Sequence, residues 1–338
     1  MNILVTGATS FLGTETVRTM LAAGHTVYAP VRASSARRSL LPRDPGLHVV
    51  DASLDAPRRI LDAGIPELSA AVSFAWAGVG VKGRMDPAVQ EDNLRGTLGF
   101  MEAAAALGAK RFLFAGSQAE YGVTTERVAE GMYDGGPVTE ETAARPVSEY
   151  GKAKLRVLKE GVALAESLGM EYRHMRIFSV YGAGDHETSL VSSCVRAASS
   201  GGTAELGPCA QQWNFLYVQD CAEAITALAL KEGGDADMAG ALKEGRDAGS
   251  SGAGTAGLFN VFNIGSRDTR QLKNFVNEIF ETAGRGSCVF RDRPAGPEGT
   301  PWLAPDIGRI SAFTGWTPQT SFRDGILSIL KESERNSI

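Results

Sequence analysis

The stretch VTGATSFLG, residues 5–13, joins an apolar strand to a helix through a turn that contains Gly7, Ser10 and Gly13. Gly7 allows a tight turn, and Gly13 allows the helix to pack close to the strand. The first turn of such a helix offers free N–H groups and the positive end of the helix dipole to a phosphate. Ser10 stands where a middle glycine is common, but its side chain is small and its hydroxyl can donate to phosphate. The stretch therefore predicts a nucleotide-binding turn rather than a βα turn without a ligand.

Six short apolar runs follow one another through the first half of the chain, separated by segments with helical spacing. They are NILVTG (2–7), TVYAPV (26–31), LHVVDA (47–52), AAVSFAW (70–76), RFLFAGS (111–117) and YRHMRIFSV (172–180). Continuous apolar strands that alternate with helices are typical of a parallel sheet covered on both faces. The spacing of roughly 20 to 40 residues leaves room for right-handed helical crossovers. We therefore predict an α/β fold with a Rossmann-like doubly wound parallel sheet.

The regular pattern loosens past the middle of the chain, which indicates a smaller α/β cap that binds the substrate. We expect a dinucleotide-binding domain over residues 1–178, with return segments near 216–232 and 258–282. The cap is expected to be discontinuous over 179–338. Within it, residues 233–257 hold eight glycines in 25 positions and almost no large apolar side chains. Such a segment cannot bury enough surface to offset its ordering entropy, so we predict a mobile surface loop there.

The bulk composition argues against several classes of protein. The net charge is −5 and the chain has no Lys/Arg block, so the electrostatic footprint of a nucleic-acid binder is missing. No apolar run approaches the roughly 20 residues that span a bilayer, and the first residues lack the charged start of a signal peptide. The four cysteines form no C-x-x-C pair, and four histidines make a metal cage improbable. We expect a cytoplasmic protein without a metal, a membrane or a nucleic acid as partner.

The end of the second predicted strand bears on the choice of cofactor. An NAD-preferring domain of this kind usually ends that strand on a carboxylate that holds the ribose hydroxyls, whereas VYAPVRASSARR offers Arg32, Arg37 and Arg38. Guanidinium groups suit a 2′-phosphate, although Arg37 and Arg38 can equally solvate a helix face. We therefore expect NADP(H), bound by Arg32, with NAD(H) as the alternative. Asp51, beside Ala52 at the end of the third strand, is placed to reach the adenine amino group.

Tyr150 and Lys154 lie four residues apart in the segment VSEYGKAKLRVLKEG, which has helical spacing. They therefore share one face of the predicted helix, one turn from each other. A free tyrosine has a pKa near 10, and an ammonium about 4 Å away lowers it by an amount of the order that proton transfer at pH 7 requires. The strand before this helix ends on Ser117. Together the three residues indicate acid/base chemistry at a carbonyl.

These segments resemble a known family. TGATSFLG, GSQAEYG, YGKAK and RIFSVYGAGD are similar to the extended short-chain dehydrogenase/reductases of the NAD-dependent epimerase/dehydratase family, which act on nucleotide sugars, over nearly the whole chain. SFAWAGV, GSQAEYG, RIFSVYG and QQWNFLYVQD most resemble the branch of CDP-abequose and CDP-paratose synthases, which are 4-ketoreductases. The resemblance implies an NADP(H)-dependent 4-ketoreductase of a nucleotide-linked 4-keto-deoxyhexose. The alternatives are a nucleotide-sugar 4-epimerase with the same residues and a non-catalytic NADP-binding regulator.

The resemblance also implies roles for individual residues. Ser117 would hold the sugar carbonyl oxygen, Tyr150 would give it a proton, and Lys154 would bind the nicotinamide ribose and lower the tyrosine pKa. The expected cofactor-binding residues are Gly7, Thr9, Ser10, Phe11, Leu12, Gly13, Arg32, Asp51, Ala52, Phe74, Ala75, Trp76, Asn93, Tyr150, Lys154, Phe178 and Val180. The expected substrate-binding residues are Ser117, Gln118, Ser179 and Trp213. Ser179 replaces an asparagine and Trp213 an arginine that are common in the family, which leaves the nucleotide of the substrate open.

The residues after Ser117 argue against one reaction of the family. Sugar 4,6-dehydratases place acidic residues there to remove and deliver protons, whereas this chain has Gln118 and Ala119. Glu120 follows, and on a continued strand its side chain would face away unless a turn re-aims it. We therefore do not expect a dehydratase. A homodimer through the helix around 88–108 and the helix of Tyr150 is a further expectation, drawn from the family.

Overall fold

The computed structural model describes the whole chain except residues 132, 134, 234–258, 293–298 and 336–338. The loop expected over 233–257 lies outside the described residues apart from Gly233.

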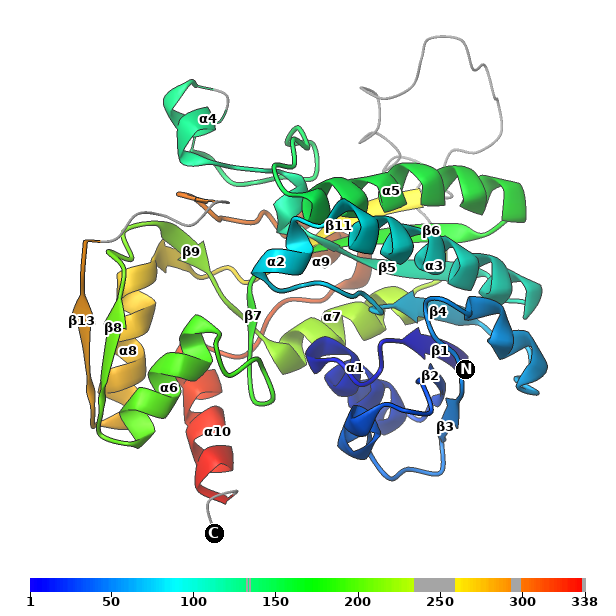
Figure 1. The fold of residues 1–338 in the computed structure, drawn as a ribbon, viewed down its shortest axis with the longest axis horizontal. Coiled ribbons are helices and arrows are strands. Elements are labelled where there is room, and N and C mark those ends of the chain that lie inside the picture. The colour runs from blue at the N-terminus through cyan, green and yellow to red at the C-terminus, as the bar shows by residue number, and fades with distance from the viewer. Residues whose placement is uncertain (132, 134, 234–258, 293–298, 336–338) are drawn as a thin grey trace.

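Seven strands form one central sheet, in the order β11-β6-β5-β4-β1-β2-β3 (Figure 1). Their bounds are Asn2–Thr6 (β1), Thr26–Pro30 (β2), Leu47–Val50 (β3), Ala70–Ser73 (β4), Arg111–Ser117 (β5), Glu171–Ile177 (β6) and Phe259–Ile264 (β11). Every neighbouring pair in this sheet is parallel. The predicted Rossmann-like doubly wound sheet is confirmed. β11 comes from the second half of the chain and extends the sheet beyond β6.

Helices cover both faces of this sheet (Figure 1). The pair α3 (Pro87–Ala106) and α5 (Glu149–Leu168) covers one face, and α1 (Phe11–Ala22) and α7 (Val218–Leu230) cover the other. The apolar strands explain this arrangement, because successive side chains of a strand point to opposite faces. Ile3 and Val5 belong to the core under α1 and α7, whereas Leu4 belongs to the core under α3 and α5.

A smaller group of elements lies at one end of the sheet, on the left of Figure 1. Its helices are α6 (Leu190–Ser199), α8 (Leu272–Ala283) and α10 (Phe322–Arg335). Its strand pairs are β8 (Thr203–Leu206) with β13 (Ser287–Phe290), β9 (Gln212–Asn214) with β12 (Thr269–Gln271), and β7 (Val180–Tyr181) with β10 (Leu216–Tyr217). The aromatic rings of Phe215, Phe275 and Phe322 pack in its core.

Shorter helical segments connect these parts. They are α2 (Val81–Arg84), α4 (Thr125–Ala129), α9 (Gly308–Thr314) and the 3₁₀ turns Ala36–Leu40 (η1), Pro57–Asp62 (η2) and Gln118–Glu120 (η3). Within the described residues, no helix is both long and apolar enough to cross a membrane. Because the sheet is parallel, the carboxyl ends of β1, β4, β5 and β6 meet at one edge, where ligands of doubly wound sheets bind.

Candidate active site

The turn after β1 has a backbone that only glycines allow. Gly7 has a φ of +67°, and a Cβ on it would lie 2.6 Å from the backbone nitrogen of Ala75. A Cβ on Gly13 would collide with the carbonyl oxygen of Gly7. Ser10 caps helix α1, and its hydroxyl oxygen accepts from the backbone N–H of Gly13 at 3.1 Å. The turn is therefore drawn tightly against the chain that follows β4.

This turn has the groups that a pyrophosphate requires. The first N–H groups of a helix have no partner within the helix, and here they belong to Phe11 and Leu12 at the start of α1. The Ser10 hydroxyl oxygen accepts a hydrogen bond, so its proton can be donated to a phosphate. Ser10 has a φ of −77°, so a serine occupies this position without strain. The residues present therefore fit a dinucleotide at this edge of the sheet.

Two joined cavities run along the edge of the sheet. The first has a volume of about 1020 Å³ and the second of about 890 Å³, and both are lined by Ser10, Arg37, Phe74 and Trp76. Of the predicted residues, those on the first cavity are Ser10, Phe11, Leu12, Phe74, Trp76, Ser117, Gln118, Tyr150, Lys154, Phe178, Ser179 and Val180. Those on the second are Gly7, Thr9, Ser10, Arg32, Ala52, Phe74, Ala75, Trp76 and Asn93. The structure thus brings together residues from all parts of the first half of the chain.

Three predicted residues do not line either cavity. Gly13 lies under the turn, where its lack of a side chain lets Gly7 pack on it. The Asp51 carboxylate accepts from the Ala33 N–H at 2.9 Å, pairs with Arg59 at 3.2 Å and is half exposed, so its role at the adenine stays a prediction. Trp213, on β9, packs among the aromatic side chains around Phe215.

The start of α5 brings Tyr150 next to Ser117. Ser148 caps this helix, and its hydroxyl accepts from the Gly151 N–H at 3.2 Å. A Cβ on Gly151 would lie only 2.7 Å from the carbonyl oxygen of Ala119, so a glycine is needed for α5 to approach the turn after Ser117. As a result, Tyr150 and Ser117, which lie 33 positions apart in the sequence, line the same cavity.

Lys154 lies one turn further along α5 and is almost completely buried. Its ammonium donates to the carbonyl oxygen of Ala115 at 2.6 Å and lies 3.7 Å from the centre of the Trp76 ring and 4.4 Å from that of Phe114. Burial lowers the pKa of Lys154 to about 7, against the opposing influence of the Glu120 carboxylate. Folding therefore disfavours the charged form of Lys154, and strongly shifted pKa values of this kind are typical of functional sites.

The chain after β4 forms one wall of the cavity and is held by α3. Trp76 donates from its indole nitrogen to Gln90 Oε1 at 2.8 Å. The buried Asn93 side chain accepts from the Ala77 N–H at 2.8 Å and donates to the Ala77 carbonyl at 2.9 Å. Asn93 thus fixes the backbone next to Trp76.

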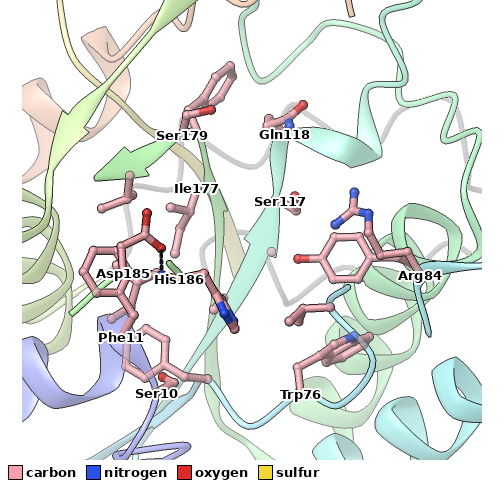
Figure 2. A pocket seen from close by; sticks show the side chains of 18 of the residues that line it. Ser10, Phe11, Trp76, Arg84, Ser117, Gln118, Ile177, Ser179, Asp185 and His186 are labelled. Atoms are coloured by element: carbon pink, nitrogen blue, oxygen red, sulfur yellow. Dashed lines mark hydrogen bonds between the residues drawn. The ribbon is translucent and has the colours of Figure 1, made fainter. Parts of the chain in front are cut away.

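Arg84 is a cavity residue that the sequence did not point to. Its guanidinium carbon lies 4.1 Å from the centre of the Tyr150 ring, which is a cation–π distance. Figure 2 shows Arg84 on one side of the cavity and Asp185 with His186 on the other. The carboxylate of Asp185 accepts from the His186 N–H at 2.7 Å. Only the fold of α2 brings Arg84 over a tyrosine 66 positions away, so local sequence carries no signal for this contact.

The turn after Ser117 determines the direction of the Glu120 side chain. Residues 118–120 form η3, in which Ser117 Oγ accepts from the Ala119 N–H at 3.2 Å. The turn does re-aim Glu120, but it aims the carboxylate into the core, where the side chain is fully buried. The carboxylates that line the first cavity are those of Asp185 and Glu187, from the loop after β7. No acid occupies either position directly after Ser117, as the sequence indicated.

Comparison with known proteins places the chain in a family. Residues 3–238 match the model of the "NAD dependent epimerase/dehydratase family". The chain is 24% identical to a probable UDP-glucuronate 4-epimerase of Rhizobium meliloti (strain 1021), over 99% of this chain and 98% of the relative. It is also 24% identical to a UDP-glucose 4-epimerase of Corynebacterium glutamicum, over 94% of this chain and 91% of the relative.

Solved structures share the fold. A UDP-glucose 4-epimerase from Thermotoga maritima, solved with UDP-glucose, aligns over 100% of both chains with a TM-score of 0.81 and 20% identity. A UDP-glucose 4-epimerase from Thermus thermophilus, solved with NAD, aligns over 100% of both chains with a TM-score of 0.79 and 18% identity. The chain belongs to the NAD dependent epimerase/dehydratase family, a group of nucleotide-sugar enzymes with the short-chain dehydrogenase/reductase fold.

Proposed function

We propose that this enzyme is a nucleotide-sugar 4-epimerase that works by oxidation and reduction at C4 of the sugar. The observation that carries the proposal is that Ser117, Tyr150 and Lys154 line one cavity, into which the phosphate-binding turn also opens. The two relatives named above, a UDP-glucuronate and a UDP-glucose 4-epimerase, support this choice over the ketoreductase expected from the sequence.

Each of the three residues has a distinct task in this proposal. Because Ser117 Oγ accepts from the Ala119 N–H, its own proton is available to the oxygen at C4 of the sugar. Tyr150 moves a proton to and from that oxygen as general acid and base. The cations of Lys154 and Arg84 stabilise the tyrosine in its deprotonated form. When bound, the nicotinamide of the cofactor would accept and return a hydride.

The cofactor proposed is a nicotinamide dinucleotide, and Arg32 favours its 2′-phosphorylated form. Arg32 and Arg37 line the second cavity, next to Ala52 and Gly7. No acidic residue ends β2, so the residues offer a cation rather than a carboxylate to the ribose. NAD(H) remains the alternative, and a structural neighbour was solved with NAD.

The choice of cofactor can be tested by fluorescence titration. Arg32→Ala is expected to raise the Kd for NADPH at least tenfold and to change the Kd for NADH about twofold or less, because it removes a charged hydrogen bond to one phosphate. Arg38→Ala is the matched control, since Arg38 belongs to the same basic segment but does not line either cavity. Equal affinities of the wild type for the two cofactors would contradict the NADP(H) preference.

A 4-ketoreductase, including the CDP-abequose-like enzyme that the sequence resembles, is the second candidate. Arg32 favours it, because a reductase must exchange its cofactor in every turnover and phosphorylated NADPH is the usual reductant for such steps. We also keep as proposals the division into a dinucleotide-binding domain (1–178 with its return segments) and a cap, the homodimer and the cytoplasmic location.

One set of incubations separates the candidates. UDP-, dTDP- and CDP-linked hexoses and their 4-keto derivatives are incubated with the enzyme and analysed by NMR and by absorbance at 340 nm. The proposal predicts interconversion of C4 epimers without net change of NADPH or NADH. Stoichiometric loss of NADPH with a 4-keto sugar would instead support the reductase. Tyr150→Phe must abolish either reaction, and turnover that survives this change would contradict both.

A further inference from the structure

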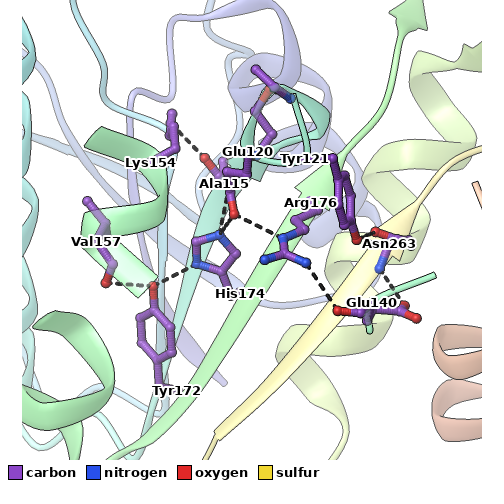
Figure 3. A network of polar contacts seen from close by, with 12 residues as sticks. Ala115, Glu120, Tyr121, Glu140, Lys154, Val157, Tyr172, His174, Arg176 and Asn263 are labelled. Carbon is purple, nitrogen blue, oxygen red and sulfur yellow. Dashed lines mark hydrogen bonds and ion pairs between the residues drawn. The ribbon is translucent and has the colours of Figure 1, made fainter. Parts of the chain in front are cut away.

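A buried polar network surrounds Glu120, which contacts the backbone of Ser117 (Figure 3). At its centre, Glu120 Oε1 accepts from the backbone N–H of Ser117 at 2.8 Å. His174 Nε2 lies 2.9 and 3.0 Å from the two carboxylate oxygens, and Arg176 Nε donates to Oε2 at 3.0 Å. Glu120 and His174 are fully buried, and Arg176 is 4% exposed. Hydrogen bonds therefore reach both oxygens of the Glu120 carboxylate and hold it in one orientation.

The neighbouring glycine shows how tightly this network packs against β5. A Cβ on Gly116 would collide with His174 Nε2 and lie 2.7 Å from Glu120 Oε1. Gly116 has no positive φ in the structure, so the glycine is required by the network and not by the backbone. Gly116 therefore makes room for the network, and it also lines the first cavity.

The ionised Glu120 carboxylate lies between two cations, Arg176 and Lys154. His174 Nε2 donates to the Glu120 carboxylate, and Nδ1 lies 3.0 Å from the Tyr172 hydroxyl, which also donates to the Val157 carbonyl at 3.3 Å. Burial lowers the pKa of His174. Although burial alone would raise the pKa of Glu120, its partners His174 and Arg176 and the Ser117 N–H lower it to about 2. The cations on either side of the ionised carboxylate are Arg176 and Lys154.

Lys154 is also coupled to this network through the backbone and through its charge. It donates to the carbonyl of Ala115, two residues before Ser117 on the same strand. The charge of Glu120 favours the protonated form of Lys154, and the charge of Arg84 opposes it from the cavity side. Tyr150, from the same helix as Lys154, and His174, from β6, complete the titratable groups around the ammonium.

We propose that Glu120 is a positioning residue. It holds Ser117 in place through the backbone N–H of that residue, and it is the counter-charge that keeps Lys154 protonated. The proposal rests on the function proposed above, because it assigns Glu120 a task through Ser117 and Lys154 rather than contact with the sugar.

The test uses Glu120→Gln, which keeps the shape of the side chain and removes its charge. Glu140→Gln is the matched control: Glu140 is a second buried carboxylate of the network, accepts from the Asn263 N–H at 2.7 Å, and lies on the other side of Arg176 from Lys154 (Figure 3). NADH binding by fluorescence and turnover are measured between pH 6 and 9. Both should decline at high pH as Lys154 loses its proton.

Glu120→Gln is expected to move this decline by about one pH unit to lower pH, because an opposite charge of this kind typically shifts a pKa by 1–3 units. Arg84→Gln should move it to higher pH, and Glu140→Gln should leave it in place. In the background of Ser117→Ala, Glu120→Gln should lower kcat by a smaller factor than in the wild type, because the residue that Glu120 positions is already lost.

Two results would overturn the proposal: an unmoved decline in folded Glu120→Gln, or the same kcat factor for Glu120→Gln with and without Ser117. Should Glu120→Gln fail to fold by circular dichroism, Arg84→Gln decides, and an unmoved decline in that variant overturns the charge balance. The NADH titration needs no sugar, so it tests Glu120 even if the epimerase proposal fails. Loss of epimerisation with an intact shift in the NADH titration would count against the proposed function alone.

Discussion

Lys154 is expected to lower the stability of the protein without cofactor, and Lys154→Met measures by how much. Burial lowers the pKa of Lys154 from 10.5 to about 7, which corresponds to about 5 kcal/mol of unfavourable free energy for the charged form at neutral pH. The methionine variant loses the hydrogen bond to the Ala115 carbonyl, which costs about 1–3 kcal/mol. The variant should therefore be about 2–4 kcal/mol more stable than the wild type at pH 7.

The pH dependence of this difference follows from the direction of the shift. The pKa of Lys154 is lower in the folded than in the unfolded protein, so between pH 7 and 10.5 the unfolded chain binds more protons. The contribution of Lys154 to the stability of the wild type therefore rises with pH in this window, by up to about 1.4 kcal/mol per pH unit, and the variant lacks this contribution. The advantage of Lys154→Met should shrink steadily from pH 7 to pH 9.

Urea unfolding at pH 7, 8 and 9, followed by circular dichroism, gives the free energies of unfolding. Lys152→Met is the control, because Lys152 lies on the same helix but is half exposed and pairs with Glu149 on the surface. Its effect should stay within about 0.5 kcal/mol at every pH. A Lys154→Met variant less stable than the wild type at pH 7, or a difference that does not change with pH, would refute the reasoning.

Three further predictions address the turn, the wall and the buried network. Gly7→Ala should raise the Kd for NADPH and NADH at least tenfold in fluorescence titrations. The φ of Gly7 is +67°, and the new Cβ would lie 2.6 Å from the backbone nitrogen of Ala75. An unchanged Kd would exclude this turn as the phosphate site. Asn93→Ala should lower the free energy of unfolding by about 2–3 kcal/mol, because it removes the side-chain partner of the N–H and of the carbonyl of Ala77. A loss below about 0.5 kcal/mol in urea unfolding would show that these two backbone groups form other hydrogen bonds. Because the pKa of Glu120 is lowered from 4.5 to about 2, its contribution of about 3 kcal/mol should be present above pH 4.5 and lost as the pH falls to 2. The stability gap between wild type and Glu120→Gln should therefore close over that range in acid unfolding, and a gap independent of pH would contradict the ionised carboxylate.

The sequence predicted the sheet well because its signals are local. Strands such as β1, β4 and the first part of β5 are continuous apolar runs, and the turn at Gly7 and Gly13 needs glycines that few other structures require. β6 departs from this pattern, because it carries the buried polar residues Arg173, His174 and Arg176. The face shared by Tyr150 and Lys154 follows from helical spacing alone. Most of the expected site residues therefore lie on the two cavities.

The parts that sequence reasoning missed depend on contacts between distant segments. Arg84 reaches the Tyr150 ring only because α2 folds back over α5. The direction of Glu120 depends on His174 and Arg176, more than 50 positions away, which draw the carboxylate into the core. The role of Asp51 at the adenine stays a prediction; its contacts to the Ala33 N–H and to Arg59 are likewise not evident from the local sequence.

The central claim is that this site epimerises a nucleotide sugar by redox chemistry at C4, and one measurement tests it most directly. The enzyme is incubated in D₂O with UDP-glucose and with UDP-glucuronate, and the products are followed by proton NMR. We predict that the C4 epimer accumulates and that its C4–H signal keeps full intensity, because hydrogen at this carbon never exchanges with solvent. Deuterium at C4 of the product, or no C4 epimer from either substrate, would contradict the account.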